Sequence, residues 1–169
     1  MEFNDIVYSS CGAEKDFAER LGFKKLLVLG KDIQIRDLDK SKDTNAAGLI
    51  VTGSNKQRLE GAVKSGALAV EVTDYRIERK LMQTMKDREV KLLISFGALK
   101  KLEGSGRQRA LYLMSKLLRT AMKMGIEVRF ASMAESKLHM FSSMQLIELA
   151  RLIGADESAA RAGISKLKA

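Results

Sequence analysis

Two arginines follow a pair of closely spaced glycines in the second half of the chain. Gly104 and Gly106 free the backbone just before an expected helix, and Arg107 and Arg109 would fall in its first turn. The first turn of a helix presents unpaired backbone N–H groups and the positive end of the helix dipole, so arginines there favour a bound anion. The most direct interpretation is a phosphate site.

The helix that follows is expected over residues 105–124, and it continues the positive charge along its length. Its cations are Lys116, Arg119 and Lys123. Apolar residues recur at helical spacing, which predicts that one face packs against the rest of the protein. The sequence leaves three interpretations of this segment open: a nucleic-acid surface, a phosphate site of an enzyme, and a solvated helix face. The expected inward residues are Leu111, Met114, Leu117, Leu118 and Met122.

The overall charge favours anionic partners. The chain carries 30 lysines and arginines against 21 aspartates and glutamates, a formal net charge of +9, and its isoelectric point is about 9.7. Such a balance favours nucleic acid first and an anionic membrane second. Aromatic residues make up only 5% of the sequence and tryptophan is absent, so a base-stacking platform is poorly supplied. Phosphate contacts are therefore expected to dominate any nucleic-acid binding.

Length and composition indicate one soluble domain over residues 1–169. The chain is 46% hydrophobic and 30% charged, which is ordinary for a globular protein. No apolar run is long enough to span a membrane, and the first residues lack the pattern of a signal peptide. The single cysteine, Cys11, excludes an internal disulfide and fits a reducing compartment, so a cytoplasmic location is expected.

Apolar runs alternate with amphipathic segments almost throughout the chain, which predicts alternating strands and helices. Continuous apolar strands between helices are typical of a parallel sheet covered by helices. This pattern fits either a doubly wound sheet or a small, incomplete βα barrel. Strands are expected at 5–10, 24–30, 32–40, 48–54, 67–74, 90–98 and 126–132, and helices at 14–23, 55–66, 75–89, 105–124, 142–155 and 156–165.

Other chemistries have little support. The glycine turn lacks the third glycine of a dinucleotide-binding loop, and no P-loop motif occurs. Asp5, Glu71 and Asp74 lie at or near strand positions and allow a carboxylate-only magnesium site, but a buried salt bridge is the simpler explanation for Glu71. Cys11 lies between a strand and a helix, where a thiolate is favoured, and His139 is the only histidine available as its base. Those two residues form a dyad only if the fold brings them together.

The cations cluster after strands or on helix faces. Loops that follow the strands of a parallel βα fold lie on one face, so the cations in those loops are expected to meet there. A single exposed cation is most simply a solvated charge. The better evidence for a phosphate-binding surface is that several cations are expected on the same face. The candidate phosphate-binding residues are Lys56, Arg58, Arg76, Arg79, Lys100, Arg107, Arg109, Lys116, Arg119 and Lys137.

Two blocks in the second half of the chain resemble a known family. The first block is Arg107, Arg109, Leu111, Ser115, Leu118, Arg119, Ala121 and Gly125, followed by IEVRFAS and Ala134. The second is Ser136, Leu138, Ser142, Leu146, Leu149, Leu152 or Ile153, and Gly154. Together with the upstream segment ALAVEVTDYR, they resemble the ribonuclease P protein component 3 family, the archaeal homologues of the eukaryotic thirty-kilodalton ribonuclease P subunit. Met133, Phe141 and Ser143 replace a glycine, an arginine and a proline of the family pattern.

The resemblance covers about residues 48–165 and implies a TIM-barrel-like (βα) barrel, small or incomplete, related to PHP-type barrels. It implies a non-catalytic, RNA-binding subunit of ribonuclease P, in which the catalytic RNA removes 5′ leaders from precursor tRNA. It also implies a complex with ribonuclease P protein component 2, as two copies of each, and only indirect contact with precursor tRNA. No cofactor is expected on the protein, because Mg²⁺ would belong to the RNA.

The leading hypothesis is therefore an RNA-binding subunit whose candidate phosphate-binding residues contact the RNA. A second hypothesis is a small βα-barrel phosphoesterase, or another enzyme that holds a phosphorylated substrate at the turn of residues 104–109. Such an enzyme would need a general base or a metal in a closed pocket. A third hypothesis is a protein-interaction module that has a basic surface and no role with RNA.

Overall fold

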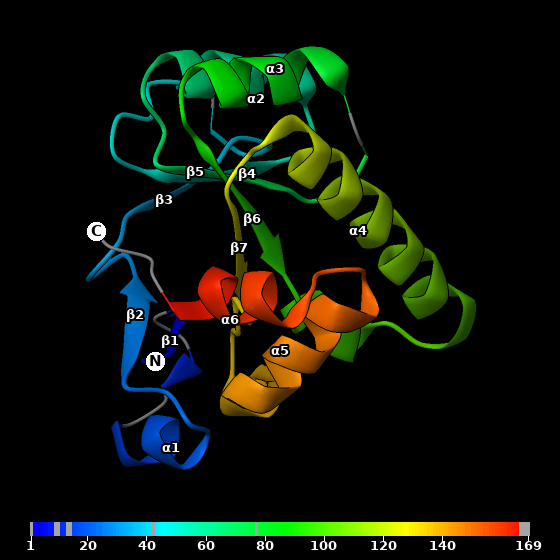
Figure 1. Ribbon diagram of the computed structural model, residues 1–169. Helices are drawn as coiled ribbons and strands as arrows, with labels where there is room; N and C mark the ends of the chain where they lie inside the picture. Colours follow the sequence, from blue (N-terminus) through cyan, green and yellow to red (C-terminus); the bar gives the residue numbers. More distant parts are fainter. Residues whose placement is uncertain (1, 9–10, 13–14, 42, 77, 166–169) are drawn as a thin grey trace. The chain divides into compact units, whose positions relative to one another are not determined.

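The computed structural model describes residues 2–8, 11–12, 15–41, 43–76 and 78–165. Within them the alternation of strands and helices is confirmed. Parts of the expected elements lie outside the described residues, namely Ser9 and Ser10 of the first strand, Glu14 of the first helix and Ile77 of the third. In chain order (Figure 1) the elements are β1 (Asn4–Tyr8), α1 (Lys15–Arg20), β2 (Lys25–Leu29), β3 (Ile35–Asp37), β4 (Ile50–Gly53), α2 (Lys56–Lys64), β5 (Ala69–Val72), α3 (Arg79–Asp87), β6 (Lys91–Ser95), η2 (Gly97–Lys101), α4 (Gly104–Met124), β7 (Val128–Ala131), η3 (Lys137–His139), α5 (Ser143–Leu152) and α6 (Glu157–Ser165).

The strands form parallel sheets, as their apolar runs predict. β1 pairs with β2, and the other sheet has the order β3-β4-β5-β6-β7. The pairs β3–β4, β4–β5 and β5–β6 are parallel. Between β6 and β7, the Leu92 N–H donates to the Glu127 carbonyl at 2.9 Å and the Phe96 N–H donates to the Ala131 carbonyl at 3.0 Å. Both bonds have the same sequence offset, which is the register of parallel strands.

The segment after β7 continues the hydrogen bonding with β1. The Met133 N–H donates to the Ile6 carbonyl, and the Tyr8 N–H donates to the Ala134 carbonyl, both at 2.9 Å. No ladder joins β2 to β3 in the described part of the chain, so a closed barrel is not seen there. The α/β class is thus confirmed, whereas the expected TIM-barrel-like closure is not.

Contacts divide the described residues into two compact units. One unit comprises residues within 1–33, 95–112 and 129–169, and the other comprises residues within 34–94 and 113–128. The second unit has a core in which buried strand residues face the apolar sides of α2 and α3. The first unit buries a cluster around β1. The core of the second unit includes Ile50, Val51, Leu59, Val63, Val70, Leu81, Met85 and Leu92, and the cluster in the first includes Val7, Cys11, Ala134 and Met140.

Every strand after β1 is shorter than its apolar pattern predicted, and two of them show a structural reason. Residues 32–40 form a strand only at β3, because the preceding segment turns and the Asp32 carboxylate accepts the Val28 N–H at 2.9 Å. The strand expected at 90–98 ends at Ser95, and Gly97 begins the 3-10 helix η2. The Gly97 N–H donates to the Ser132 carbonyl at 2.7 Å, so Gly97 also lies against the segment after β7. The chain therefore enters α4 from a turn.

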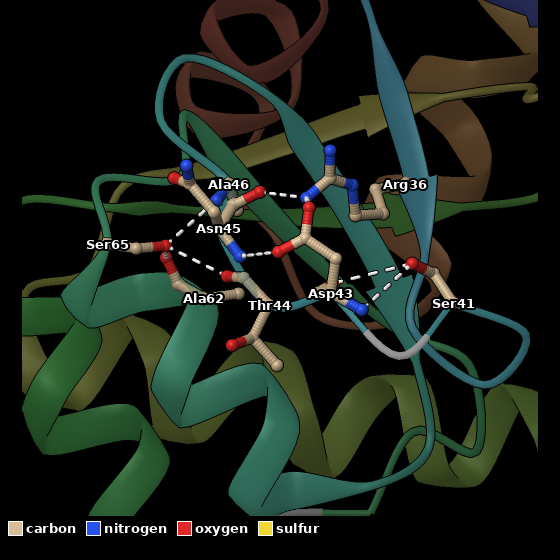
Figure 2. Close-up of polar contacts among 8 residues, drawn as sticks. All are labelled: Arg36, Ser41, Asp43, Thr44, Asn45, Ala46, Ala62 and Ser65. Atoms are coloured by element: carbon tan, nitrogen blue, oxygen red, sulfur yellow. Dashed lines mark hydrogen bonds and ion pairs between the residues drawn. The ribbon is translucent and has the colours of Figure 1, made fainter.

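A polar network orders the loop between β3 and β4 (Figure 2). The Arg36 guanidinium donates to the Asp43 carboxylate at 2.5 Å and also to the Asn45 carbonyl. At the other side of the loop, the Ser65 hydroxyl contacts the Thr44 carbonyl at 3.0 Å and accepts the Ala46 N–H at 2.9 Å. The loop is therefore tied both to β3 and to the end of α2, although its composition predicted only a polar connection.

Candidate nucleic-acid interface

The long helix α4 carries a basic stripe, which we define as Arg109, Tyr112, Lys116, Arg119 and Lys123. Consecutive members are three or four residues apart, so they lie on one face of the helix. All five side chains are exposed, and Tyr112 is 60% exposed. The basic stripe thus presents four cations and one aromatic ring to solvent along a single helix.

The opposite face of α4 is apolar, as the sequence predicted. Met114, Leu117, Leu118 and Ala121 are buried, so the spacing that buries them turns the basic stripe outward. Leu111 is half-buried. Met122, expected to lie inward, is 41% exposed because its position falls on the edge of the apolar face. The packing of the apolar face, and not the cations themselves, therefore determines that the cations point outward.

Within the basic stripe, Arg119 is oriented by its own helix. Its Nε and one terminal nitrogen contact the Ser115 hydroxyl at 3.2 and 2.8 Å. A neutral hydroxyl leaves the guanidinium charge uncompensated, so the residue still attracts an anion. Arg109 makes no side-chain hydrogen bond or ion pair within the described residues. Successive members of the basic stripe lie about one helical turn, or about 5.4 Å, apart along the axis, and the four cations among them suit the repeated charges of a phosphate backbone.

The glycine turn differs from its expected form. Gly104 and Gly106 belong to the first turn of α4, and Gly104 has φ = +47°, in the left-handed region that glycine adopts readily. The Arg107 Nε donates to the Leu99 and Leu102 carbonyls at 3.2 and 2.9 Å. One edge of the Arg107 guanidinium thus closes the turn between η2 and α4, a structural contact that the expected phosphate site did not include.

Lys100 also has internal partners. Its Nζ donates to the Leu138 and Met140 carbonyls at 3.0 and 2.5 Å, and it lies 4.4 Å from the centre of the Phe141 ring. Burial lowers the pKa of this ammonium. Lys137 lies 5.8 Å from the centre of the Phe17 ring. Lys137, which belongs to η3, thus contacts α1, and Lys100 stabilises the loop around η3 directly.

In the second unit, Lys56 and Arg58 lie at the start of α2, where Lys56 contacts an acidic group and the charge of Arg58 acts on another. Lys56 forms an ion pair with Asp74, and only 16% of the Lys56 side chain is exposed. The Ser54 backbone N–H, at 3.0 Å, is the main cause that lowers the pKa of Asp39, and the Arg58 charge contributes as well. The N-terminus of α2 thus already faces a carboxylate from the same chain.

The cations at the start of α3 and just before it are more accessible. Arg76 and Arg79 are exposed, and neither side chain has an ion pair or hydrogen bond in the described ranges. Lys80 bonds the buried Glu60 at 3.0 Å. Glu60 also accepts from Lys64 at 2.6 Å, and the hydrogen bonds from these two lysines lower its pKa. Arg76 and Arg79 therefore keep the solvent access that a phosphate contact needs.

The carboxylates considered for enzyme chemistry, and Cys11, are buried or paired within the fold. Asp5 is fully buried and accepts the Ser132 N–H at 2.7 Å, and Asp74 pairs with Lys56. Glu71 and Cys11 are buried. No group of three or more histidine, cysteine, aspartate or glutamate residues that could hold a metal ion is present in the described part of the chain.

Sequence reasoning identified Arg109, Lys116 and Arg119 as candidates, and α4 brings these three onto one face. The list of candidate phosphate-binding residues left out Tyr112, and also Lys123, although Lys123 was recognised as a cation of the same helix; helical spacing could have placed both on this face. It did not identify the partners of Lys56, Lys100 and Arg107, since those contacts join separate elements. None of the described helices combines the length and the apolar character that crossing a membrane requires.

Comparisons with known proteins give fold likenesses only. No family model matches the chain, and no curated protein sequence matches it. A chain in the cryo-EM structure of archaeal ribonuclease P with mature tRNA is similar, with a TM-score of 0.64 and 17% identity over 94% of this chain and 77% of that one. The resemblance expected from the sequence is thus confirmed at the level of the fold.

Two other solved structures share a smaller part of the fold. They are A. niger ochratoxinase, with a TM-score of 0.51 and 14% identity over 70% of this chain, and a Xaa-Pro dipeptidase with bound methionine, with a TM-score of 0.50 and 16% identity over 68% of this chain. The aligned part spans only 28% and 31% of those longer chains. These likenesses therefore concern the α/β architecture and no activity.

Proposed function

We propose that this chain is an RNA-binding protein subunit of ribonuclease P that supports the catalytic RNA in removing 5′ leaders from precursor tRNA. The observation that carries the proposal is the fold likeness to a chain of archaeal ribonuclease P over 94% of the sequence. The two sequence blocks that resemble the component 3 family support it independently. In this proposal the protein acts in the cytoplasm, and cleavage and its Mg²⁺ ions belong to the RNA.

The proposed RNA contact is the basic stripe of α4. Its four cations would neutralise phosphates and release the counterions that condense on RNA, so affinity would fall steeply as salt rises. Two accessible cations, Arg79 at the start of α3 and Arg76 just before it, would add to the contact. The buried face of α4 already fixes the position of the stripe. RNA binding would therefore have to order only the cationic side chains, and the entropic cost of that ordering would be small.

The proposed assembly also contains a protein partner. Ribonuclease P protein component 2 is the expected partner, with two copies of each chain, and precursor tRNA would be contacted through the RNA. This part of the proposal depends on the family resemblance in the sequence and on the fold likeness to a chain in the structure of archaeal ribonuclease P with mature tRNA.

The test compares two variants of equal charge. In the stripe variant, Lys116, Arg119 and Lys123 are changed to Gln, and in the control variant, Lys15, Lys24 and Lys25 are changed to Gln. All six side chains are exposed, so both variants should fold, which circular dichroism and thermal melting would verify. Binding of the catalytic RNA is measured at several KCl concentrations between about 0.1 and 0.5 M.

The stripe variant should bind at least about tenfold more weakly at low salt, and its slope of log affinity against log salt should be smaller by about 2 to 3. The control variant should lose much less affinity, since its lysines change only the overall charge. Reconstituted cleavage of precursor tRNA should follow the same order. Equal losses in the two variants would contradict an interface on α4, and failure of the wild-type chain to bind or support the catalytic RNA would reject the function.

A further inference from the structure

An open groove lies along the pair of helices α5 and α6, within one unit of the protein. It has a volume of about 790 Å³, and its apolar lining includes Phe141, Leu149, Leu152 and Ala155. Leu152 is 68% exposed and lines the groove together with Phe141 and Leu149, so it belongs to an apolar patch and is not an isolated exposed leucine. The groove thus presents apolar surface that the described part of the chain leaves open to solvent.

The charge of the groove is opposite to that of the whole protein. Three acidic residues, Glu148, Asp156 and Glu157, line it together with one cation, Arg151, which pairs with Glu148 at 2.9 Å. The chain as a whole carries a net charge of +9. An acidic lining on a basic protein repels RNA phosphates and attracts a cationic occupant.

The acids are held in place by the helices. The Asp156 carboxylate accepts the Ala159 N–H at 2.8 Å and so caps α6, and the Glu157 carboxylate bonds Arg161 at 2.9 Å. The Ser142 hydroxyl accepts the Gln145 N–H and the Gln145 side chain accepts the Ser142 N–H, a capping box that fixes the start of α5. A groove with such fixed walls is largely preformed for a ligand.

We propose that this groove docks an amphipathic helical segment of a protein partner, with leucine-like side chains on one face and lysines or arginines beside them. The apolar side chains would cover Leu149 and Leu152, and the cations would lie against Glu148 and Glu157. This is the helix-in-groove mode of recognition, in which anchors at helical spacing enter an apolar groove. The inference depends on the groove alone and does not require the proposed role in ribonuclease P.

The test uses three synthetic peptides of about four turns each, about one turn longer than the 10 residues of α5. One has a leucine face flanked by lysines, the second replaces the lysines by glutamates, and the third scrambles the first so that no apolar face forms. Binding to the full chain is measured by fluorescence anisotropy, and the contact site is mapped by NMR on ¹⁵N-labelled protein. The basic amphipathic peptide should bind at least about tenfold more tightly than either of the others.

Two matched variants locate the contact. Leu152→Asn removes the exposed apolar anchor of the groove, and Met144→Asn removes an exposed apolar residue of the same helix that does not line the groove. Leu152→Asn should weaken binding about tenfold, and Met144→Asn should change it little. Both positions are exposed, so both variants should fold, which the NMR spectrum verifies.

Several results would overturn the proposal. These are equal binding of the three peptides, shifts that fall outside α5 and α6, and equal effects of the two variants. Sedimentation of the wild-type chain alone gives a further test. If the chain self-associates and Leu152→Asn abolishes this association, the groove binds a second copy of the chain, and the proposal is overturned. RNA-binding measurements on Leu152→Asn separate this proposal from the proposed function, since the stripe on α4 is unchanged in that variant.

Discussion

The buried carboxylate of Asp5 binds both the backbone and the side chain of Ser132. One carboxylate oxygen accepts the Ser132 N–H at 2.7 Å and the Ile6 N–H at 2.8 Å, and the other accepts the Ser132 hydroxyl. These bonds join β1 to the segment after β7, which lies far along the sequence. They favour the charged carboxylate, but burial outweighs them and raises the pKa of Asp5 to about 6.

Changing Asp5 to Asn should therefore alter how stability depends on pH. Because the pKa of Asp5 is higher in the folded chain, about 6 against 3.8, the folded state binds more protons between those values. Stability is thus favoured by protonation at low pH and falls as pH rises from about 4 to about 6, by roughly 3 kcal/mol in all. The oxygen of the substituted amide can still accept the two backbone N–H groups without a charge, so Asp5→Asn should be more stable than wild type at pH 7.

Urea unfolding of both proteins between about pH 4.5 and 7.5 tests this expectation. At each pH, the unfolding free energy of wild type is subtracted from that of Asp5→Asn. Carboxyls whose pKa is lowered, such as Glu60, titrate equally in both proteins, so their contribution cancels and the difference reports Asp5. The advantage of Asp5→Asn should grow with pH up to about 6 and then remain constant. A difference that is independent of pH would show that Asp5 does not titrate in this range.

Gly97 has no room for a side chain. A methyl group at Gly97 would lie 2.3 Å from the Ser132 carbonyl oxygen, to which the Gly97 N–H already donates. Gly97→Ala should therefore lower the unfolding free energy by about 1–3 kcal/mol. The matched control is Gly106→Ala, where the nearest atom is a Leu102 methyl carbon at 3.8 Å and the residue lies in α4. That change should raise stability by about 0.5–1 kcal/mol. Thermal melting that ranks the two variants in the opposite order would contradict the close approach at Gly97.

Lys100 should contribute to stability more than to RNA binding. Lys100→Met removes the donor to the Leu138 and Met140 carbonyls and should cost about 1 kcal/mol or more, as measured by urea unfolding. The control is Lys101→Met, which breaks only an exposed ion pair with Glu135 and should cost less. In RNA titrations, Lys100→Met should leave the salt slope unchanged. A slope smaller by about 1 would instead assign Lys100 to a phosphate contact.

The parts of the structure that sequence predicted are those that depend on local periodicity. The order of strands and helices follows from apolar runs, and the basic stripe follows from spacing within one helix. Partners of individual cations were not predictable, because Lys56 reaches Asp74 and Lys100 reaches Met140 only after the chain has folded. The 3-10 helix at Gly97 was missed for a different reason: its buried residues Gly97 and Leu99 continue the apolar run of β6, so periodicity does not mark where the strand ends.

Tyr112 offers a way to separate stacking from charge within the basic stripe. Its ring is 60% exposed and lies one helical turn from Arg109 and Lys116 on the same face of α4. If a base stacks on this ring, Tyr112→Ala should weaken RNA binding by about 1–3 kcal/mol and leave the salt slope unchanged. Lys116→Gln should weaken binding and lower the slope by about 1. Tyr112→Phe keeps the ring and should bind like wild type. RNA titrations at several salt concentrations measure both quantities, and a Tyr112→Ala variant that binds as tightly as wild type would restrict the interface to phosphate contacts.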